Sequence, residues 1–348
     1  MLIRSIVPLR VSFCGGGTDV SPYVEEFGGA VLSCTINKYS YATLAPNQTR
    51  DINIQSLDFD TFVRYKFDEE VSYEGKLGLV KAVIQEMKAP SGMDIYLHSD
   101  APPGSGLGSS SAVAVAMVGV MKEYLQQCLT SYEIAELAYD IERNRLGIKG
   151  GRQDQYATCF GGFNLIEFRK DSTVVNPLRI RSSTSRELQY HLMLCYTGQT
   201  RLSAGIISHQ IDLYVQKNAE TLDAMKEMKE VTLRMKNALL QERLAEFGEL
   251  LDYSGVLKKR MNPRVTNDRI DEMYEVARKH GAIGGKLLGA GGGGYLLLFV
   301  KFNCRRKVAE ELRKVGGQIV DFAFELQGLQ TWRANNLGYE FSLCNASS

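Results

Sequence analysis

The sequence predicts an α+β protein of two domains that share one cleft. At 348 residues, the chain is longer than a single compact core usually needs. Polar and apolar residues alternate over much of the first 65 positions, which predicts strands, whereas apolar residues recur every three to four positions over 203–251, which predicts helices. Glycine-bearing loops lie between the predicted elements, so a ligand site built from loops is expected.

The first hundred residues are predicted to be mainly strand. Residues 10–14 alternate, and 29–44 mix β-branched and aromatic residues with polar ones at period two. The segment between them is expected to be a loop with a short helix near 22–27. Apolar residues at helical spacing predict a helix over 76–89, and a strand is expected over 91–100.

Two helices are expected next, and then a domain boundary. Residues 111–127 are apolar all round for three turns, which predicts a buried helix. The helix over 130–147 begins with a capping box, Thr130 followed three residues later by Glu133. A polar stretch rich in Ser, Thr and Arg follows, and it divides the chain into an N-terminal domain over 1–185 and a C-terminal domain over 186–348.

The second half is expected to combine helices with a small sheet. Methionines recur along one face of 203–251, which suits either a promiscuous binding surface or, as we favour, the core of a helical layer. The remaining elements are expected to be helices over 268–280 and 304–315 and strands over 294–300 and 316–326.

Composition excludes several classes of protein. Lys plus Arg number 41 and Asp plus Glu 40, so the net charge of +1 provides no bulk field for nucleic acid or an anionic membrane. Seven scattered cysteines without a CxxC pair suggest neither a disulfide framework nor a zinc site. The N-terminus does not resemble a signal peptide, and no apolar run approaches the roughly 18 residues that span a bilayer. We expect a cytoplasmic protein that binds small molecules; a homodimer is left open.

The stretch "APPGSGLGSSSA" suggests an anion site. Backbone N–H groups of a glycine-rich turn and of the following helix N-terminus can bind phosphate, and the helix dipole adds a favourable field. The stretch is neither a Walker A motif nor a dinucleotide fingerprint. A purely structural turn before a buried helix explains the glycine spacing equally well. The candidate phosphate-binding residues are Pro103, Gly104, Ser105, Gly106, Leu107, Gly108, Ser109 and Ser110.

Other glycine clusters strengthen the phosphate hypothesis. Five glycines occupy 289 and 291–294, directly before an apolar strand, and each costs roughly 0.5–1 kcal/mol relative to alanine in ordered structure. Close packing against a ligand or against the other glycine loop would require them. The candidate residues of this third glycine loop are Gly289, Gly291, Gly292 and Gly293. Two more loops carry a lone acid each, Asp19 and Asp154, so the cleft is expected to bind a phosphorylated nucleotide and a polar second substrate.

Three motifs in order resemble those of the GHMP kinases, the family of galactokinase, homoserine kinase, mevalonate kinase and phosphomevalonate kinase. They are "PLRVSFCGGGTD", "PPGSGLGSSSA" and "KLLGAGGGGYLLLF". The resemblance implies a ribosomal-protein-S5-like N-terminal domain, a ferredoxin-like C-terminal domain, ATP and Mg²⁺. Within the family, the chain is similar to the bacterial group that phosphorylates the anomeric hydroxyl of D-glycero-D-manno-heptose 7-phosphate.

The resemblance implies roles for the chemistry-bearing residues. Asp154 matches the catalytic aspartate, and Arg10 an arginine near the transferred phosphoryl group. Glu142 and Ser110, with Ser109 as the neighbouring alternative, match the residues that hold Mg²⁺. Without the resemblance, Asp154 would be a helix N-terminal acid and Glu142 a helix-surface charge.

Substrate contacts follow from the same comparison. Asp19 matches an aspartate that hydrogen-bonds sugar hydroxyls. Galactokinase has Glu-His before Thr-Asp, where this chain has Gly16 and Gly17 before Thr18, which argues against galactose. A distal phosphate would need a cation, and the candidates are Lys149, Arg152 and Arg201, each of which could equally be a solvated surface charge. The alternatives left open are an L-fucose or other hexose 1-kinase and an inactive sensor on a kinase scaffold.

Overall fold

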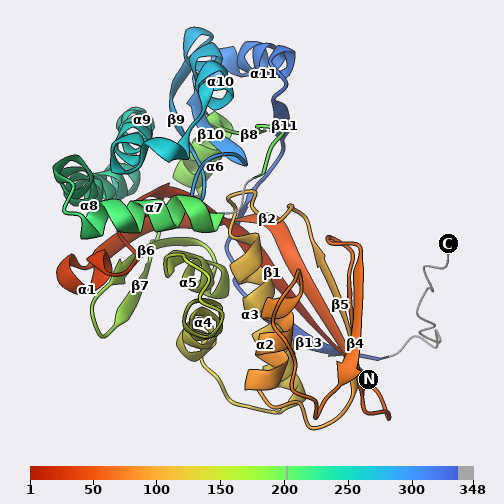
Figure 1. Ribbon diagram of the computed structural model, residues 1–348. Helices are drawn as coiled ribbons and strands as arrows, with labels where there is room; N and C mark the ends of the chain where they lie inside the picture. Colours follow the sequence, from red (N-terminus) through yellow and green to blue (C-terminus); the bar gives the residue numbers. More distant parts are fainter. Residues whose placement is uncertain (201–202, 336–348) are drawn as a thin grey trace.

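The computed structural model describes residues 1–200 and 203–335 and shows two sheets joined by a helical layer (Figure 1). Nine strands of the described chain form the first sheet, centred on the long antiparallel pair β1 (Leu2–Cys14) and β2 (Gly29–Pro46). The other strands from the first half are β3 (Asp51–Ser56), β4 (Thr61–Lys66), β5 (Met93–Ser99), β6 (Phe163–Phe168) and β7 (Thr173–Pro177).

Helix α3 (Ser109–Tyr124) packs on β1 and β2 and is buried over most of its length, which confirms the predicted buried helix. The other helices of this half are α1 (Tyr23–Phe27), α2 (Gly78–Glu86), α4 (Ser131–Tyr139) and α5 (Gln153–Phe160). The Thr130 and Glu133 capping box at the start of α4 is present. The helix predicted to run to 147 instead changes to a π-helical turn, η1 (Asp140–Arg145).

The second sheet is ferredoxin-like. Its strands β8 (Leu192–Tyr196), β9 (Ala282–Leu287), β10 (Tyr295–Val300) and β11 (Gln318–Val320) lie in the order β11-β8-β10-β9, and all neighbours are antiparallel. Side chains of β10 alternate between two cores, because Leu297 and Phe299 join the large core whereas Leu296 and Leu298 join a small one. The small core lies under α10 (Asp268–Lys279) and α11 (Arg305–Lys314). Short 3₁₀ turns, η2 (Pro263–Val265) and η3 (Phe302–Cys304), lead into them.

Helices α7 (Ser203–Val215), α8 (Ala219–Leu240) and α9 (Leu244–Met261) connect the two sheets (Figure 1). Met225, Met228 and Met235 of α8 are almost fully buried in the large core, so the methionine face is core, as favoured. This core is continuous from α3 through α8 and α9 to β8 and β10, so it joins the two sheets.

The C-terminal segment returns to the first sheet. Strand β12 (Phe324–Glu325) pairs with β2, and β13 (Gln330–Ala334) pairs with β1 along Leu2–Ile6. The predicted division at 185 falls within α6 (Ser182–His191), just before β8, and two strands from beyond it, β12 and β13, belong to the first sheet. The physical reason is that the outer edge of β1 would otherwise carry unpaired backbone groups, which β13 satisfies. Among the described helices, none is both long and apolar enough to cross a membrane.

Candidate active site

The glycine-rich turn before α3 has the backbone geometry of an anion site. Gly104, Gly106 and Gly108 all have positive φ angles, between 76° and 88°. No side chain caps the start of α3, so the N–H groups of its first turn are available to a ligand. Ser109 donates to the Pro102 carbonyl at 3.4 Å, while the exposed Ser110 turns to another partner described below. The eight residues predicted to bind phosphate therefore form one continuous loop and helix start.

The third glycine loop packs directly on this turn. A Cβ on Gly289 would lie 2.4 Å from the Cα atom of Gly106, and one on Gly294 would lie 2.1 Å from the Ser105 carbonyl oxygen. The Tyr295 N–H donates to the same carbonyl at 3.1 Å. Gly291, Gly292 and Gly293 continue the loop along Val265 and Gln199. Contact with the other glycine loop, one of the two predicted reasons for the glycine density, is thus observed.

Two buried lysines donate hydrogen bonds to backbone carbonyls in or next to the glycine loops. Lys258 of α9 donates to the carbonyls of Leu287, at 2.8 Å, and Gly289, and Lys286 of β9 donates to the Phe13 carbonyl at 3.2 Å. Burial lowers the pKa of Lys258 well below its ordinary value and lowers that of Lys286 to about 8. Neither forms an ion pair with a described carboxylate. The sequence analysis singled out neither lysine. Lys258 follows the buried Ser254 by four residues, so a helix places both on the same face, and this spacing is the signal that could have found it.

Arg10 and Asp154 form an ion pair beside the turn. The Arg10 Nε and Nη2 atoms lie 2.8 and 2.6 Å from Asp154 Oδ1, and Nη1 donates to the Gly106 carbonyl at 2.6 Å. A Cβ on Gly108 would lie 3.4 Å from the Asp154 carboxylate, so the turn passes directly over this pair. The Arg10 side chain is 3% exposed and that of Asp154 20% exposed. Asp154 can therefore present a carboxylate oxygen to the cleft from a fixed position.

Glu142 is buried and held by hydroxyl and amide donors. Its carboxylate accepts from Ser110 Oγ at 2.9 Å, Ser111 Oγ at 2.7 Å and Gln155 Nε2 at 2.6 Å, and the Arg143 guanidinium lies 3.3 Å away. Glu142 lies in the π-helical turn η1. Such turns are common at functional sites, and residue spacing alone does not predict them. A carboxylate and the exposed Ser110 hydroxyl beside a phosphate loop are hard oxygen donors that fit Mg²⁺, which keeps several waters.

The first glycine loop is tied to α5 through Asp19. The Asp19 side chain is buried, with Oδ1 accepting from the Gly17 N–H at 2.9 Å and Oδ2 from the Gln153 N–H at 3.0 Å. Burial raises the pKa of Asp19 above its ordinary value. Thr18 is also buried, and its hydroxyl bonds the Gly15 carbonyl at 2.8 Å. The family resemblance implies that Asp19 hydrogen-bonds sugar hydroxyls. In the structure both carboxylate oxygens of Asp19 accept hydrogen bonds from protein groups, one of them the N–H of Gly17, which follows Gly16 in the loop.

The three predicted distal cations differ in their surroundings. Lys149 is exposed on the loop before α5. Arg152 lies over the Tyr139 ring, 5.0 Å from its centroid, and bonds Glu25 at 3.2 Å, so its guanidinium has an internal partner. Arg201 lies outside the described residues. Arg143, which sequence reasoning missed, donates to the Gly151 carbonyl at 3.3 Å and shapes the same loop.

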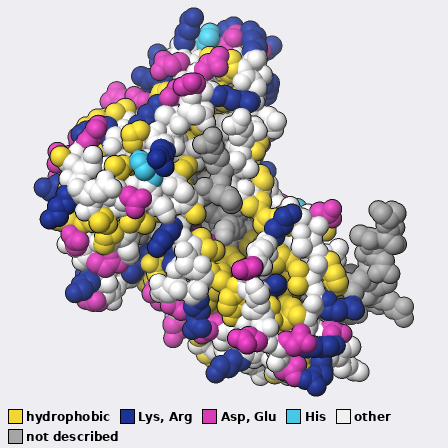
Figure 2. Space-filling view, viewed as in Figure 1, with side chains coloured by type: hydrophobic (Ala, Val, Ile, Leu, Met, Phe, Trp, Pro, Cys, Tyr) yellow, Lys and Arg dark blue, Asp and Glu magenta, His cyan; other side chains and the backbone are white. Residues whose placement is uncertain are grey.

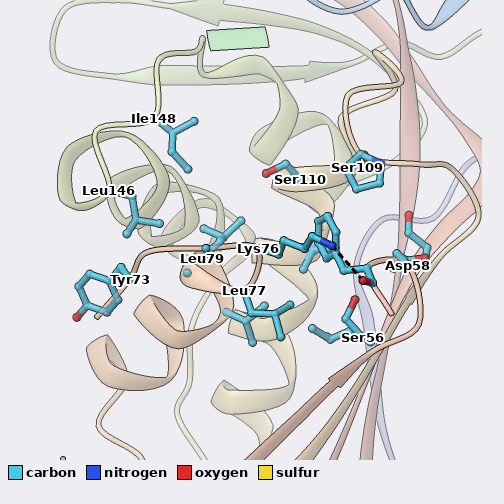
Figure 3. A pocket seen from close by; sticks show the side chains of 18 of the residues that line it. Ser56, Asp58, Tyr73, Lys76, Leu77, Leu79, Ser109, Ser110, Leu146 and Ile148 are labelled. Carbon is cyan, nitrogen blue, oxygen red and sulfur yellow. Dashed lines mark hydrogen bonds between the residues drawn. The ribbon is translucent and has the colours of Figure 1, made fainter. Parts of the chain in front are cut away.

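A cavity of about 540 Å³ opens beside Ser109 and Ser110 (Figure 3). Its walls come from the β3–β4 loop, from the segment entering α2 and from the loop after η1, and they are mainly apolar. Sequence reasoning proposed no residues for a nucleotide base, because these apolar side chains come from segments far apart in the chain. They include Phe59, Tyr73, Leu77, Leu79, Val80, Leu97, Val113, Leu146 and Ile148.

The site as a whole has the parts of a phosphotransferase. The glycine-rich turn lies between an apolar cavity of nucleotide size and a carboxylate paired with an arginine, which is the arrangement that positioning and charge stabilisation of a transferred phosphoryl group require. On the face shown in Figure 2, Lys and Arg side chains are interspersed with Asp and Glu. Fold and site thus place the protein among kinases that act on small molecules.

Comparison with known proteins identifies the family. The model for the GHMP kinases N terminal domain matches residues 77–162, and that for GHMP kinases C terminal matches 235–318. A D-glycero-alpha-D-manno-heptose 7-phosphate kinase from Campylobacter jejuni is 37% identical over 337 residues, covering 95% of this chain and 99% of that protein. The chain belongs to the GHMP kinases, which use ATP to phosphorylate an alcohol group.

Solved structures agree with this assignment. A D-glycero-D-manno-heptose 1-phosphate kinase from Bacteroides thetaiotaomicron superposes with a TM-score of 0.81 at 31% identity, covering 96% of this chain and all of that one. Among sequence relatives, an L-fucokinase/L-fucose-1-P guanylyltransferase from Bacteroides fragilis is 26% identical across 94% of this chain, which spans 38% of that protein. The expected α+β fold, with its two GHMP kinase domains, is confirmed.

Proposed function

We propose that the chain transfers the γ-phosphoryl group of ATP to the anomeric C1 hydroxyl of D-glycero-D-manno-heptose 7-phosphate, giving the 1,7-bisphosphate for nucleotide-activated heptose and surface polysaccharide synthesis. The observation that carries the proposal is 37% identity to a heptose 7-phosphate kinase across nearly the full length of both chains. The opening loop with Gly16 and Gly17 in place of galactokinase's Glu-His supports a sugar other than galactose.

The apolar cavity and the glycine turn would hold the nucleotide. The adenine base would enter the cavity beside Ser109 and Ser110, where desolvation of a flat ring is favourable. The phosphates would then lie along the turn at the start of α3, on N–H groups and in the helix dipole field. Gly104, Gly106 and Gly108 allow the backbone to approach the phosphate oxygens closely.

Mg²⁺ would be held by Glu142 and Ser110, and when bound it would supply positive charge that neutralises the phosphate oxygens. Ser111 and Gln155 fix the other Glu142 oxygen, so the carboxylate keeps its orientation without a cation. Ser110 is the preferred serine because it bonds Glu142, whereas Ser109 bonds the Pro102 carbonyl.

Asp154 would accept a hydrogen bond from the C1 hydroxyl and orient it toward the γ-phosphorus. In the transfer, the bond between the C1 oxygen and γ-phosphorus forms while the bond from γ-phosphorus to the β,γ-bridging oxygen breaks, and ADP leaves with that electron pair. The hydroxyl proton passes to Asp154 and then to solvent. Arg10 holds Asp154 in place and adds fixed positive charge beside the transferred group.

The heptose 7-phosphate group would need a cation away from the ATP site. Lys149 is the exposed candidate on the loop before α5, while Arg152 is held by Glu25 and Tyr139. We therefore favour Lys149 over Arg152 as a ligand of the distal phosphate, and Arg201 stays the third candidate.

The deciding experiment measures Mg²⁺-dependent ATP consumption with D-glycero-D-manno-heptose 7-phosphate, sedoheptulose 7-phosphate, L-fucose and D-mannose. We expect turnover with the manno-heptose phosphate alone, and none with the Asp154→Ala variant. Preference for L-fucose, which the similarity to fucokinases favours as second candidate, would reject the heptose assignment and keep the kinase. ATP binding without transfer to any sugar would instead support a sensor.

A further inference from the structure

Ser12 has a buried hydroxyl without a partner, close to the reacting groups. Side chains alternate along β1, so Ser12 projects from the same face as Arg10, two residues earlier. Ser12 is 5% exposed, and its Oγ has no hydrogen-bond partner among the described residues. Native proteins rarely leave a buried hydroxyl unpaired, because the lost water contacts are not replaced. The Ser12 hydroxyl therefore has a hydrogen-bonding capacity that no described residue fills.

Gln153 presents a second unpaired oxygen. Its Nε2 donates to both carboxylate oxygens of Asp19, at 3.3 and 3.2 Å. A carboxylate bonded to backbone N–H groups acts as an acceptor, so it fixes which end of the amide faces it. Gln153 Oε1 therefore points away from Asp19, and it has no partner among the described residues. Asp19 thus orients an acceptor, although its own oxygens are engaged.

Gly16 leaves the space that both oxygens border. A Cβ on Gly16 would lie 3.3 Å from Gln153 Nε2, which is a tight contact, 3.8 Å from Ser12 Oγ and 4.0 Å from Gln153 Oε1. The φ angle of Gly16 is outside the left-handed region, unlike those of Gly15 and Gly17, so its backbone does not require glycine. The missing side chain is what matters at this position. The gap left by the absent Cβ is a small recess between one hydroxyl and one amide oxygen, and Gln153, which carries the amide, directly precedes Asp154.

We propose that this recess binds the C2 hydroxyl of the sugar, next to the C1 hydroxyl that is phosphorylated. Ser12 Oγ would donate to the C2 oxygen, and the C2 hydroxyl would donate to Gln153 Oε1. Both are then substrate-binding residues, and Asp19 is a positioning residue that sets the Gln153 amide. The inference rests on the proposed function, because it needs an acceptor with a hydroxyl beside the reacting one.

The test compares Ser12→Ala and Gly16→Ala with Ser33→Ala. Ser33 is the matched control because it faces Ser12 on β2, is fully buried and also has an unpartnered hydroxyl, but it is not among the groups next to Gly16. We expect Ser12→Ala to raise the KM for the sugar about tenfold, as for one lost hydrogen bond. Gly16→Ala should raise it more, because the methyl group fills the recess. The KM for ATP should stay within about twofold for all three variants, and Ser33→Ala should match the wild type.

A sugar without the hydroxyl separates binding from a structural effect. With the 2-deoxy analogue of the heptose 7-phosphate, the penalty of Ser12→Ala should shrink to about twofold or less, since the wild type has lost the same bond. A tenfold penalty that persists on the deoxy sugar, or equal effects of Ser12→Ala and Ser33→Ala, would overturn the proposal. If Ser12→Ala does not fold, Ser12→Cys keeps the side-chain volume and Gly16→Ala tests the same recess.

Failure of the proposed function has a different signature. If the wild type prefers another sugar of the panel, the heptose assignment falls, and the recess is tested with that sugar and its analogue deoxygenated beside the phosphorylated position. If the wild type transfers phosphate to none of the sugars, both proposals are rejected.

Discussion

Asp154 is the residue whose chemistry most directly tests the site. Asparagine keeps the size of the side chain and can still bond Arg10, but it cannot take the hydroxyl proton. We expect Asp154→Asn to lower kcat by about 10²–10⁴-fold while the KM for ATP changes little. Steady-state kinetics in both substrates measure the two effects. A variant that keeps more than a tenth of the wild-type kcat would remove Asp154 from the chemical step.

Asp19 should make stability depend on pH in an unusual direction. Burial raises its pKa above the ordinary 3.8, so between 3.8 and the raised value the folded protein binds more protons than the unfolded chain does. The contribution of Asp19 to the free energy of unfolding therefore falls as pH rises through that window. Because Asp19→Asn removes the titration, we expect the unfolding free energy of the wild type, minus that of the variant, to increase from pH 7 to pH 4.

Urea denaturation of both proteins at each pH gives this difference. A decrease on acidification would mean that the hydrogen bonds from Gly17 and Gln153 stabilise the charged form more than burial disfavours it.

The sequence could place Asp19 in a loop expected to contact the sugar. It could not show that Gln153 donates hydrogen bonds to the Asp19 carboxylate, because this contact joins residues 134 positions apart.

At the scale of elements, the contact between the two glycine loops predicts a specific difference between two glycines. Gly289 and Gly147 have the same φ angle, 63°, but a Cβ on Gly289 would overlap Gly106 whereas one on Gly147 would meet open space. We expect Gly147→Ala to cost about 1 kcal/mol of stability through backbone strain alone. Gly289→Ala should cost more and raise the KM for ATP, because the turn at α3 must shift.

Thermal unfolding and ATP kinetics of the two variants measure this difference. Equal losses of stability, with the same KM for ATP in both, would show that the glycine loops do not support each other. Gly147 is a suitable control for stability because its φ angle is the same as that of Gly289, so the extra loss of stability in Gly289→Ala reports the contact with Gly106.

Elements differ in how far sequence predicts them. The buried α3, the capped α4 and the methionine face of α8 follow from local patterns, and they are found as expected. The π-helical turn that presents Glu142 does not follow from a local pattern, because the same residues are equally compatible with an ordinary α-helix. The cavity beside Ser109 also escapes prediction, since its walls are apolar residues that look like core until the fold brings them to one opening.

For the whole molecule, the continuous core predicts cooperative unfolding. Residues from both sheets belong to one core, and the single tryptophan, Trp332, lies on β13 opposite Arg4 of β1. We expect tryptophan fluorescence, which reports the edge of the first sheet, and far-ultraviolet circular dichroism, which reports all elements, to give the same urea midpoint. Two separate midpoints would show that the sheets unfold independently despite the shared core.

The order in which the chain is made gives β13 a further importance. Leu2–Ile6 of β1 pair with Gln330–Ala334, so β1 leaves a ribosome long before the strand that closes its outer edge. During translation that edge exposes backbone groups beside an apolar strand, which is the condition under which nascent chains pair wrongly. The first sheet can therefore be completed only after the ferredoxin-like unit has been synthesised, and chaperones that cover strand edges would act on β1 throughout that interval.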